Sequence, residues 1–309
     1  IIALIVIISI HYLHMTNIRW GIIFQDSFTL IKIGLILFFI IFGFFVETNE
    51  QISIVPATGD IKIILSPEFA ISLIWVSYAY TGWNSSVYIA GEIEKPKVNI
   101  PKSMIIATMF VTVLYILLNY IFLYTTPVDL MIGKVEVGYI AGKQIFGHFG
   151  GKLISLGISI LLLSTVSSYI YIGPRIMHAI GEDHKILGIL SSKNASGIPI
   201  KSFWIQLVIS IIFILTSTFE QVLLYAGISL IITTIFCVIA LFVLRITKPN
   251  LKRTYKVVGF PITPILYLIL NGWILHYSFQ RAFSESLIGC VIFLIGVALY
   301  FISTKLGGK

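Results

Sequence analysis

The strongest constraint in this sequence is a series of long apolar runs separated by short polar segments. A helix needs roughly 20 mostly apolar residues to cross the hydrocarbon core of a bilayer. Eight runs come close to this length, at residues 27–46, 69–91, 103–126, 151–180, 202–219, 221–244, 262–279 and 285–304. Backbone polar groups in hydrocarbon must be satisfied within their own segment, so unbroken runs of this kind form helices. We therefore predict an all-α polytopic membrane protein.

The composition excludes several other classes of protein. Only 11% of the 309 residues are charged and 58% are apolar, whereas soluble domains carry about 25% charged residues. A transmembrane β-barrel would show segments of about ten residues that alternate between apolar and polar, and the sequence lacks them. The net charge of +8 comes from basic residues at the ends of apolar runs. This placement does not make a basic face with interleaved aromatics, so we expect no nucleic-acid partner.

The sequence shows no motif for catalysis or for metal binding. Cys237 and Cys290 lie inside apolar runs, where a free cysteine behaves as a small packing residue. The six histidines lack the spacing of a zinc site, and no phosphate-binding glycine-rich loop is present. We therefore expect no metal, no cofactor and no enzymatic activity.

The distribution of Lys and Arg predicts the orientation of the helices. Loops on one side of the predicted membrane hold 15 Lys and Arg residues, loops on the other side hold five, and Lys32 lies within a run. Cytoplasmic loops carry the excess of positive charge in membrane proteins. We expect a multi-pass protein of the cytoplasmic membrane, with its C-terminus in the cytoplasm and residues 47–68 and 127–150 outside.

The first apolar run, which begins at Ile1, is short. Residues 1–10 would form a helix of about 15 Å, half of the roughly 30 Å hydrocarbon core. We therefore expect the chain to be a piece that lacks its N-terminal part.

The run at 69–91 has an unusually polar centre. Residues 80–84 read Tyr-Thr-Gly-Trp-Asn, followed by Ser85 and Ser86. A glycine flanked by Thr and Asn favours an interruption of the helix, and irregular backbone at membrane depth is tolerated only where it is buried or lines a cavity. Many secondary transporters build a substrate site at such a broken helix. The other interpretation is a continuous helix whose small residues pack closely on a neighbour.

This segment resembles the sixth transmembrane helix of amino-acid permeases in the amino acid–polyamine–organocation superfamily, most of all in its L-type amino-acid transporter branch. The matching residues are Tyr78-Ala79-Tyr80-Thr81-Gly82-Trp83-Asn84, Gly91-Glu92-Ile93 and Asn99-Ile100-Pro101. Other segments resemble the fifth helix, the end of the eighth helix and the loop before the eleventh, in the correct order. They contain Gln25 and Lys32, then Gly173-Pro174-Arg175, then Gly259-Phe260-Pro261.

The resemblance implies a LeuT-type bundle built from inverted repeats, of which the chain covers the end of helix 4 and helices 5–12. It implies that residues 1–309 are a single transmembrane permease domain without helices 1–3 and part of helix 4. Because helix 1 of the family supplies part of the substrate site, the chain is expected to carry half of that site.

The resemblance places this half of the substrate site at the predicted break. The substrate-binding residues that it implies are Tyr78, Ala79, Tyr80, Thr81, Gly82, Trp83 and Asn84. Tyr78 matches an aromatic gate over the bound amino acid, and an ordinary packed tyrosine is the alternative. Asn84 would either bind the substrate or brace the break.

Lys32 is a charged residue inside a predicted span, which makes it a functional hypothesis by default. In proton-coupled relatives the corresponding lysine takes the place of a sodium ion, so the resemblance implies a role in proton coupling. Burial would favour its neutral form. The alternative is a lysine whose long stem carries its ammonium group to the inner membrane interface.

Further polar residues lie in the predicted helix 8 and at the cytoplasmic ends. The hydroxyls of Ser164, Thr165, Ser167 and Ser168 match positions around the cation of sodium-driven members, and packing between helices is the alternative. Glu92 and Arg175 are expected in a cytoplasmic gate. Arg175 alone would also serve as a topology anchor, and Glu92 belongs to a charged cluster with Glu94, Lys95 and Lys97.

The resemblance implies secondary transport of amino acids by alternating access, as an exchanger or a proton symporter. No acidic residue lies at the break to receive a cationic side chain, which favours neutral amino acids. The expected partners are the amino-acid substrate, H⁺ and the lipid bilayer, and the oligomeric state stays open. Two alternatives remain: an inactive or partner-dependent truncated permease, and a permease for amines or polyamines.

Overall fold

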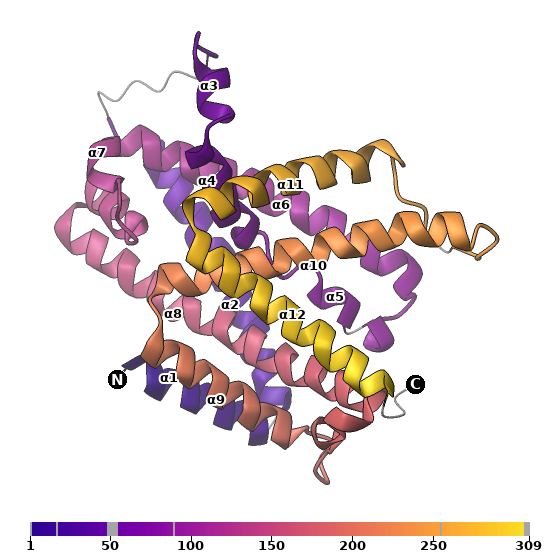
Figure 1. Cartoon of the computed structure of the whole chain (residues 1–309). Helices are drawn as coiled ribbons and strands as arrows, with labels where there is room; N and C mark the ends of the chain where they lie inside the picture. The colour runs from indigo at the N-terminus through magenta and orange to yellow at the C-terminus, as the bar shows by residue number, and fades with distance from the viewer. Residues whose placement is uncertain (1, 17, 48–54, 89, 254, 306–309) are drawn as a thin grey trace. The chain divides into compact units, whose positions relative to one another are not determined.

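The computed structural model describes residues 2–16, 18–47, 55–88, 90–253 and 255–305, and every regular element in these ranges is a helix (Figure 1). The α-helices are α1 (Ile2–Thr16), α2 (Ile18–Gly43), α3 (Asp60–Ile64), α4 (Pro67–Ala79), α5 (Ser85–Tyr88), α6 (Pro96–Thr125), α7 (Val128–Met131), α8 (Val137–Asp183), α9 (Ile200–Thr216), α10 (Phe219–Thr247), α11 (Ile262–Arg281) and α12 (Phe283–Lys305). Two 3₁₀ helices are η1 (Ala90–Glu92) and η2 (Lys185–Ser191). The predicted all-α fold is confirmed.

Six of the described helices are long and apolar enough to cross a membrane. They are α6, α8, α10, α11, α12 and the part of α2 that begins at Asp26. The predicted run at 202–219 corresponds to α9, which has 17 residues. The run at 69–91 is divided between α4 and α5. The chain is therefore a multi-pass membrane protein in which one apolar run is interrupted.

The chain separates into two compact units. The first comprises residues 1–55, 102–180 and 189–211. The second comprises residues 56–101, 181–188 and 212–309. The first unit thus holds α1, α2, α7, most of α6, α8 and α9, and the second holds α3 to α5 and α10 to α12.

Two apolar clusters hold the first unit together. One joins α2, α6 and α8 through Phe39, Ile40, Leu114, Ile121, Ala141 and Ile154. The other joins α1, α8 and α9 through Ile10, Ile170, Ile198 and Phe203, and α1 lies beside α9 in Figure 1. Lipid is as apolar as these side chains, so close packing rather than transfer from water stabilises such contacts between helices.

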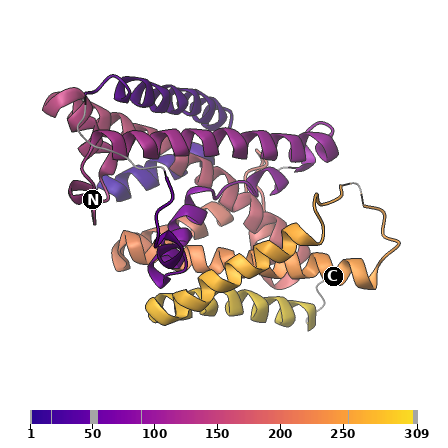
Figure 2. The same ribbon diagram turned by 90° about the horizontal axis from the view of Figure 1, so that it is seen from above.

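The second unit has its core where α4, α10, α11 and α12 meet. Its buried residues are Ile74, Ile228, Ile231, Ile232 and Ile274. Glycines let the helices approach: a Cβ on Gly227 would lie 2.7 Å from Ile74, and one on Gly289 would lie 3.0 Å from Ile228. The Ser229 hydroxyl also donates a hydrogen bond to the Gly289 carbonyl at 3.0 Å. As a result α12 packs against α10 and crosses it at an angle in Figure 1, and both helices can be followed in the view from above (Figure 2).

The helix α8 changes direction at Gly147, whose φ of 72° and ψ of −178° are not helical. Residues 137–146 form its first arm and residues 148–183 its second. The arms approach closely, since a Cβ on Gly151 would lie 2.9 Å from the backbone of Lys143. The loop expected at 127–150 therefore contains α7 and this first arm. The arm escaped the sequence analysis because it is far shorter than the roughly 20 residues of a membrane span.

Candidate functional site

The apolar run at 69–91 is interrupted where the sequence predicts a break. The helix α4 ends at Ala79 and α5 begins at Ser85, with Tyr80 as the C-cap of α4. Around the gap the backbone bonds span three residues instead of four: Thr81 N–H donates to the Tyr78 carbonyl at 3.0 Å, and Ser85 N–H donates to the Gly82 carbonyl at 3.0 Å. The alternative of a continuous helix through Gly82 is wrong.

The local sequence explains why the helix stops here. Gly82 has a φ of 104°, a conformation that residues with a Cβ rarely adopt. The Thr81 hydroxyl donates to the Tyr78 carbonyl at 2.7 Å, and the Ser86 hydroxyl donates to the Trp83 carbonyl at 3.0 Å. Hydroxyl groups that bond nearby carbonyls in this way compete with the helical pattern. Glycine and hydroxyl residues therefore produce the break together.

Two of the predicted substrate residues have side chains whose positions bear on their roles. Asn84 donates from Nδ2 to the Tyr88 hydroxyl at 2.8 Å, so in this conformation it joins the break to α5. This contact agrees with the bracing role that the sequence left open. The Trp83 side chain is half exposed. Tyr78 is partly buried and Ala79 is exposed, at the last turn of α4.

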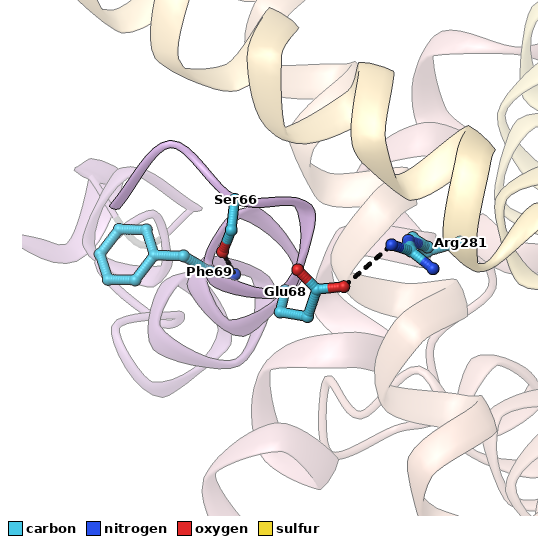
Figure 3. Close-up of polar contacts among 4 residues, drawn as sticks. All are labelled: Ser66, Glu68, Phe69 and Arg281. Atoms are coloured by element: carbon cyan, nitrogen blue, oxygen red, sulfur yellow. Dashed lines mark hydrogen bonds and ion pairs between the residues drawn. The ribbon is translucent and has the colours of Figure 1, made fainter. Parts of the chain in front are cut away.

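The beginning of α4 is fixed by two contacts at its N-terminus (Figure 3). The Ser66 hydroxyl accepts a hydrogen bond from the Phe69 N–H at 3.2 Å, which is a side-chain N-cap. Glu68 forms an ion pair with Arg281 at the end of α11, with 3.0 Å between Oε1 and Nη2. Both side chains are exposed, so the pair contributes about 0–1 kcal/mol. Together with the buried Ile74, these contacts hold the helix that precedes the break.

Lys32 and Thr165, which the sequence analysis selected separately, meet in the first unit. The Lys32 ammonium group donates a hydrogen bond from Nζ to the Thr165 hydroxyl at 2.8 Å. The lysine comes from α2 and the threonine from the second arm of α8. Both side chains are partly buried. A charged donor thus reaches a hydroxyl on a neighbouring helix.

The other predicted hydroxyls of α8 have different partners. Ser167 is fully buried, and its hydroxyl lies 2.7 Å from Nε2 of His14 on α1. Ser168 donates to the Ser164 carbonyl at 3.0 Å within its own helix. Ser164 is 1% exposed. The contacts of Ser167 and Ser168 agree with the alternative of hydroxyls that serve helix packing.

The sequence analysis overlooked His14, which is fully buried together with His11. The His11 ring Nδ1 donates to the Ile7 carbonyl at 2.8 Å, and the ring meets Phe203 edge-on at 6.4 Å. A search for metal spacing could not detect these residues. The signal was present, because two histidines three positions apart in an apolar run share one face of a helix.

Arg175 lies over the ring of Tyr171, with its Cζ 3.6 Å from the ring centre. A guanidinium group in this position makes a favourable cation–π contact. The side chain of Glu92 is outside the described residues, so the expected gate with Glu92 stays a prediction. The predicted residues Tyr78 to Asn84 belong to the second unit, whereas Lys32, Arg175 and the hydroxyls of α8 belong to the first.

A known protein family matches nearly the whole chain. The family model described as amino acid permease matches residues 1–306. The chain belongs to the amino acid permease family. The resemblance found in the sequence is thereby confirmed.

Curated relatives of this permease carry the names of transporters. It is 23% identical over 308 residues to the large neutral amino acids transporter small subunit 2 of Mus musculus, covering 98% of this chain and 57% of the relative. It is 23% identical over 316 residues to the serine/threonine exchanger SteT of Bacillus subtilis, covering 97% of this chain and 68% of the relative. The Asc-type amino acid transporter 1 of Mus musculus is 19% identical over 295 residues, or 94% of this chain and 55% of the relative. The permease chain thus spans little more than half the length of two of these relatives.

Proposed function

We propose that this permease transports amino acids across the cytoplasmic membrane by alternating access, as an exchanger or a proton symporter. The observation that carries the proposal is the break at residues 80–84 in a chain of the amino acid permease family. An interrupted helix presents the ends of two shorter helices inside the membrane, and the partial charges at such ends can bind a polar solute.

The geometry of the break supports a role for α4 in binding the substrate. The C-terminal end of a helix carries a partial negative charge, which favours a cation nearby. The end of α4 at Ala79 would therefore attract the ammonium group of an amino acid. Tyr78 and Tyr80 lie at this end and would contact the rest of the substrate.

Neutral amino acids are the proposed substrates. Residues 78–84 contain no acidic or basic side chain, so a charged substrate side chain would find no counter-ion among them. Two of the relatives are named for large neutral amino acids and for serine and threonine. The same segment gives little support to amines and polyamines, whose positive charges call for acidic groups.

Lys32 is the proposed group for proton coupling. Its ammonium group donates to Thr165 at 2.8 Å, and loss of a proton would remove one of its donors and its charge. A change in this contact would alter how α2 is held to α8. Entry of a proton together with the amino acid would make this permease a symporter, whereas uptake that requires an amino acid inside the vesicle would indicate exchange.

Uptake of labelled amino acids into proteoliposomes tests the proposal. We expect leucine or serine to be taken up, and unlabelled neutral amino acids to compete. Competition by amines or polyamines alone would overturn the proposed substrate class. Absence of uptake by the purified chain, restored when another protein is added, would favour a partner-dependent permease.

A further inference from the structure

A cavity of about 300 Å³, open to the surface, lies along the two arms of α8 in the first unit, and its residues Glu136 and Lys152 are exposed. Glu136, Tyr139, Lys152 and Ser155 line it. Glu136 directly precedes the first arm, Tyr139 stands on that arm, and Lys152 and Ser155 stand on the second. None of the four belongs to the substrate residues proposed above.

The cavity presents one acidic and one basic side chain, and among the described residues neither takes part in an ion pair. A carboxylate and an ammonium group that border one space without touching leave room for a ligand that carries both charges. An anion alone would leave Lys152 matched and Glu136 unmatched, and a cation alone would do the reverse. Such unmatched charge discriminates against the wrong ligand.

The two arms that carry Tyr139, Lys152 and Ser155 are closely packed. A Cβ on Gly138 would lie 2.8 Å from Ile158, and one on Gly142 would lie 3.3 Å from Ile154, so the two arms pack closely beside the cavity. Ala141 on the first arm is fully buried in the core that also contains Ile154. Lys152 therefore stands on a rigid element, which positions a binding group more accurately than a loop does, and Glu136 lies directly before the first arm.

We propose that this cavity is a second binding site, for a small zwitterion whose ammonium group pairs with Glu136 and whose carboxylate pairs with Lys152. Its volume is at the lower end of the roughly 300–1,000 Å³ of small-molecule sites. Tyr139 and Ser155 supply a ring and hydroxyl groups for the remainder of the ligand. That the zwitterion is a free α-amino acid rests on the proposed function.

Chemical labelling of Lys152 tests this site. The protein is placed in nanodiscs of phosphatidylglycerol, which lacks an ammonium group, and is acetylated briefly by an amine-reactive ester. Mass spectrometry then gives the ratio of modification at Lys152 to modification at Lys143, which lies on the first arm of α8 and does not line the cavity. The added ligand consumes part of the reagent, which slows the modification of both lysines equally and so leaves this ratio unchanged.

We expect leucine at ten times its dissociation constant to lower the ratio by about tenfold, since the occupied site shields the amine. Leucinamide and 4-methylpentanoate, which each carry one of the two charges, should leave it nearly unchanged. We call the decrease in this ratio protection. The substitution Glu136→Gln should abolish the protection by leucine. The matched substitution Asp129→Asn, an exposed acid on α7 outside the cavity, should preserve it.

Equal protection by 4-methylpentanoate and leucine, or none by either, would overturn the zwitterion site. Protection that appears when ethanolamine lipid is added, without any amino acid, would assign the site to a lipid headgroup instead of a free amino acid. Uptake is measured separately, on the same protein reconstituted into proteoliposomes of the same lipid. Protection without uptake counts against the transport proposal alone, and uptake without protection counts against this site alone.

Discussion

At the scale of single residues, Gly82 and Lys32 carry most of the candidate site. Gly82 gives the break its shape because its φ of 104° is open to glycine and strained for other residues. Lys32 gives the first unit a charged contact between α2 and α8. Each residue leads to a separate prediction.

Replacing Gly82 with alanine should abolish amino-acid uptake while the protein still inserts. The added Cβ costs about 1–3 kcal/mol in this backbone conformation, so the break will relax to another shape. Uptake per amount of reconstituted protein is the measurement. Gly272→Ala in α11 is the matched control, because a Cβ there meets no heavy atom within 4 Å. Normal uptake by Gly82→Ala would contradict a role for this backbone shape.

Thr165→Val and Lys32→Ala should change the pH dependence of uptake in the same way. Each substitution removes one side of the contact between Lys32 and Thr165, whereas Thr165→Ser keeps the hydroxyl and should behave like the unchanged protein. The initial rate of uptake across a range of pH values is the measurement. A pH profile that survives Lys32→Ala would exclude the lysine from proton coupling.

At the scale of helices, the contact between α1 and α8 depends on a buried pair, His14 and Ser167. Both side chains are fully buried, and the ring nitrogen and the hydroxyl are 2.7 Å apart. A buried polar group that loses its partner destabilises a protein by about 1–3 kcal/mol. Removing one partner of the pair should therefore destabilise the protein by more than the net contribution of one hydrogen bond.

We expect Ser167→Ala to lower the thermal midpoint of the protein in detergent by about 2–4 °C. The double change His14→Phe and Ser167→Ala should recover part of this loss, since removal of both polar partners leaves no group unsatisfied. Ser159→Ala is the control, because that hydroxyl is exposed and bonds only within its own helix. Equal midpoints for Ser167→Ala and Ser159→Ala would show that the histidine contact adds nothing.

The long helices could be predicted from the sequence, because an apolar run of about 20 residues in lipid must satisfy its backbone polar groups within the run. The break was also predictable, since Gly82 and its hydroxyl neighbours act locally. The pairing of Lys32 with Thr165 could not be predicted, because the two residues are 133 positions apart and their contact depends on how α2 and α8 align. The first arm of α8 was missed for another reason: its apolar residues, such as Ala141, are buried against protein in a segment too short to span a bilayer.

At the scale of the whole molecule, the charge distribution predicts which loops face the cytoplasm. The stretch between α10 and α11 holds Lys248, Lys252, Arg253 and Lys256 and no acidic residue. Arg253 donates four hydrogen bonds to carbonyls at and after the end of α10, and the three lysines are exposed. Such a loop is typical of the cytoplasmic side.

Cysteine labelling tests this orientation. In a variant whose Cys237 and Cys290 are replaced by alanine, Lys252→Cys should react with a membrane-impermeant maleimide only after the cells are opened. Asp129→Cys on α7 should react in intact cells, because residues 127–150 are expected outside. Reaction of Lys252→Cys in intact cells would reverse the proposed topology.

The two polar contacts of α8 have a mechanical consequence for the first unit. Thr165 and Ser167 are two positions apart, so they point about 200° away from each other around the helix axis. One is held by a lysine from α2 and the other by a histidine from α1. The helix α8 is therefore bonded on two opposite sides, and a rotation about its own axis would strain both hydrogen bonds. While both bonds are intact, α1, α2 and α8 should move together within this unit.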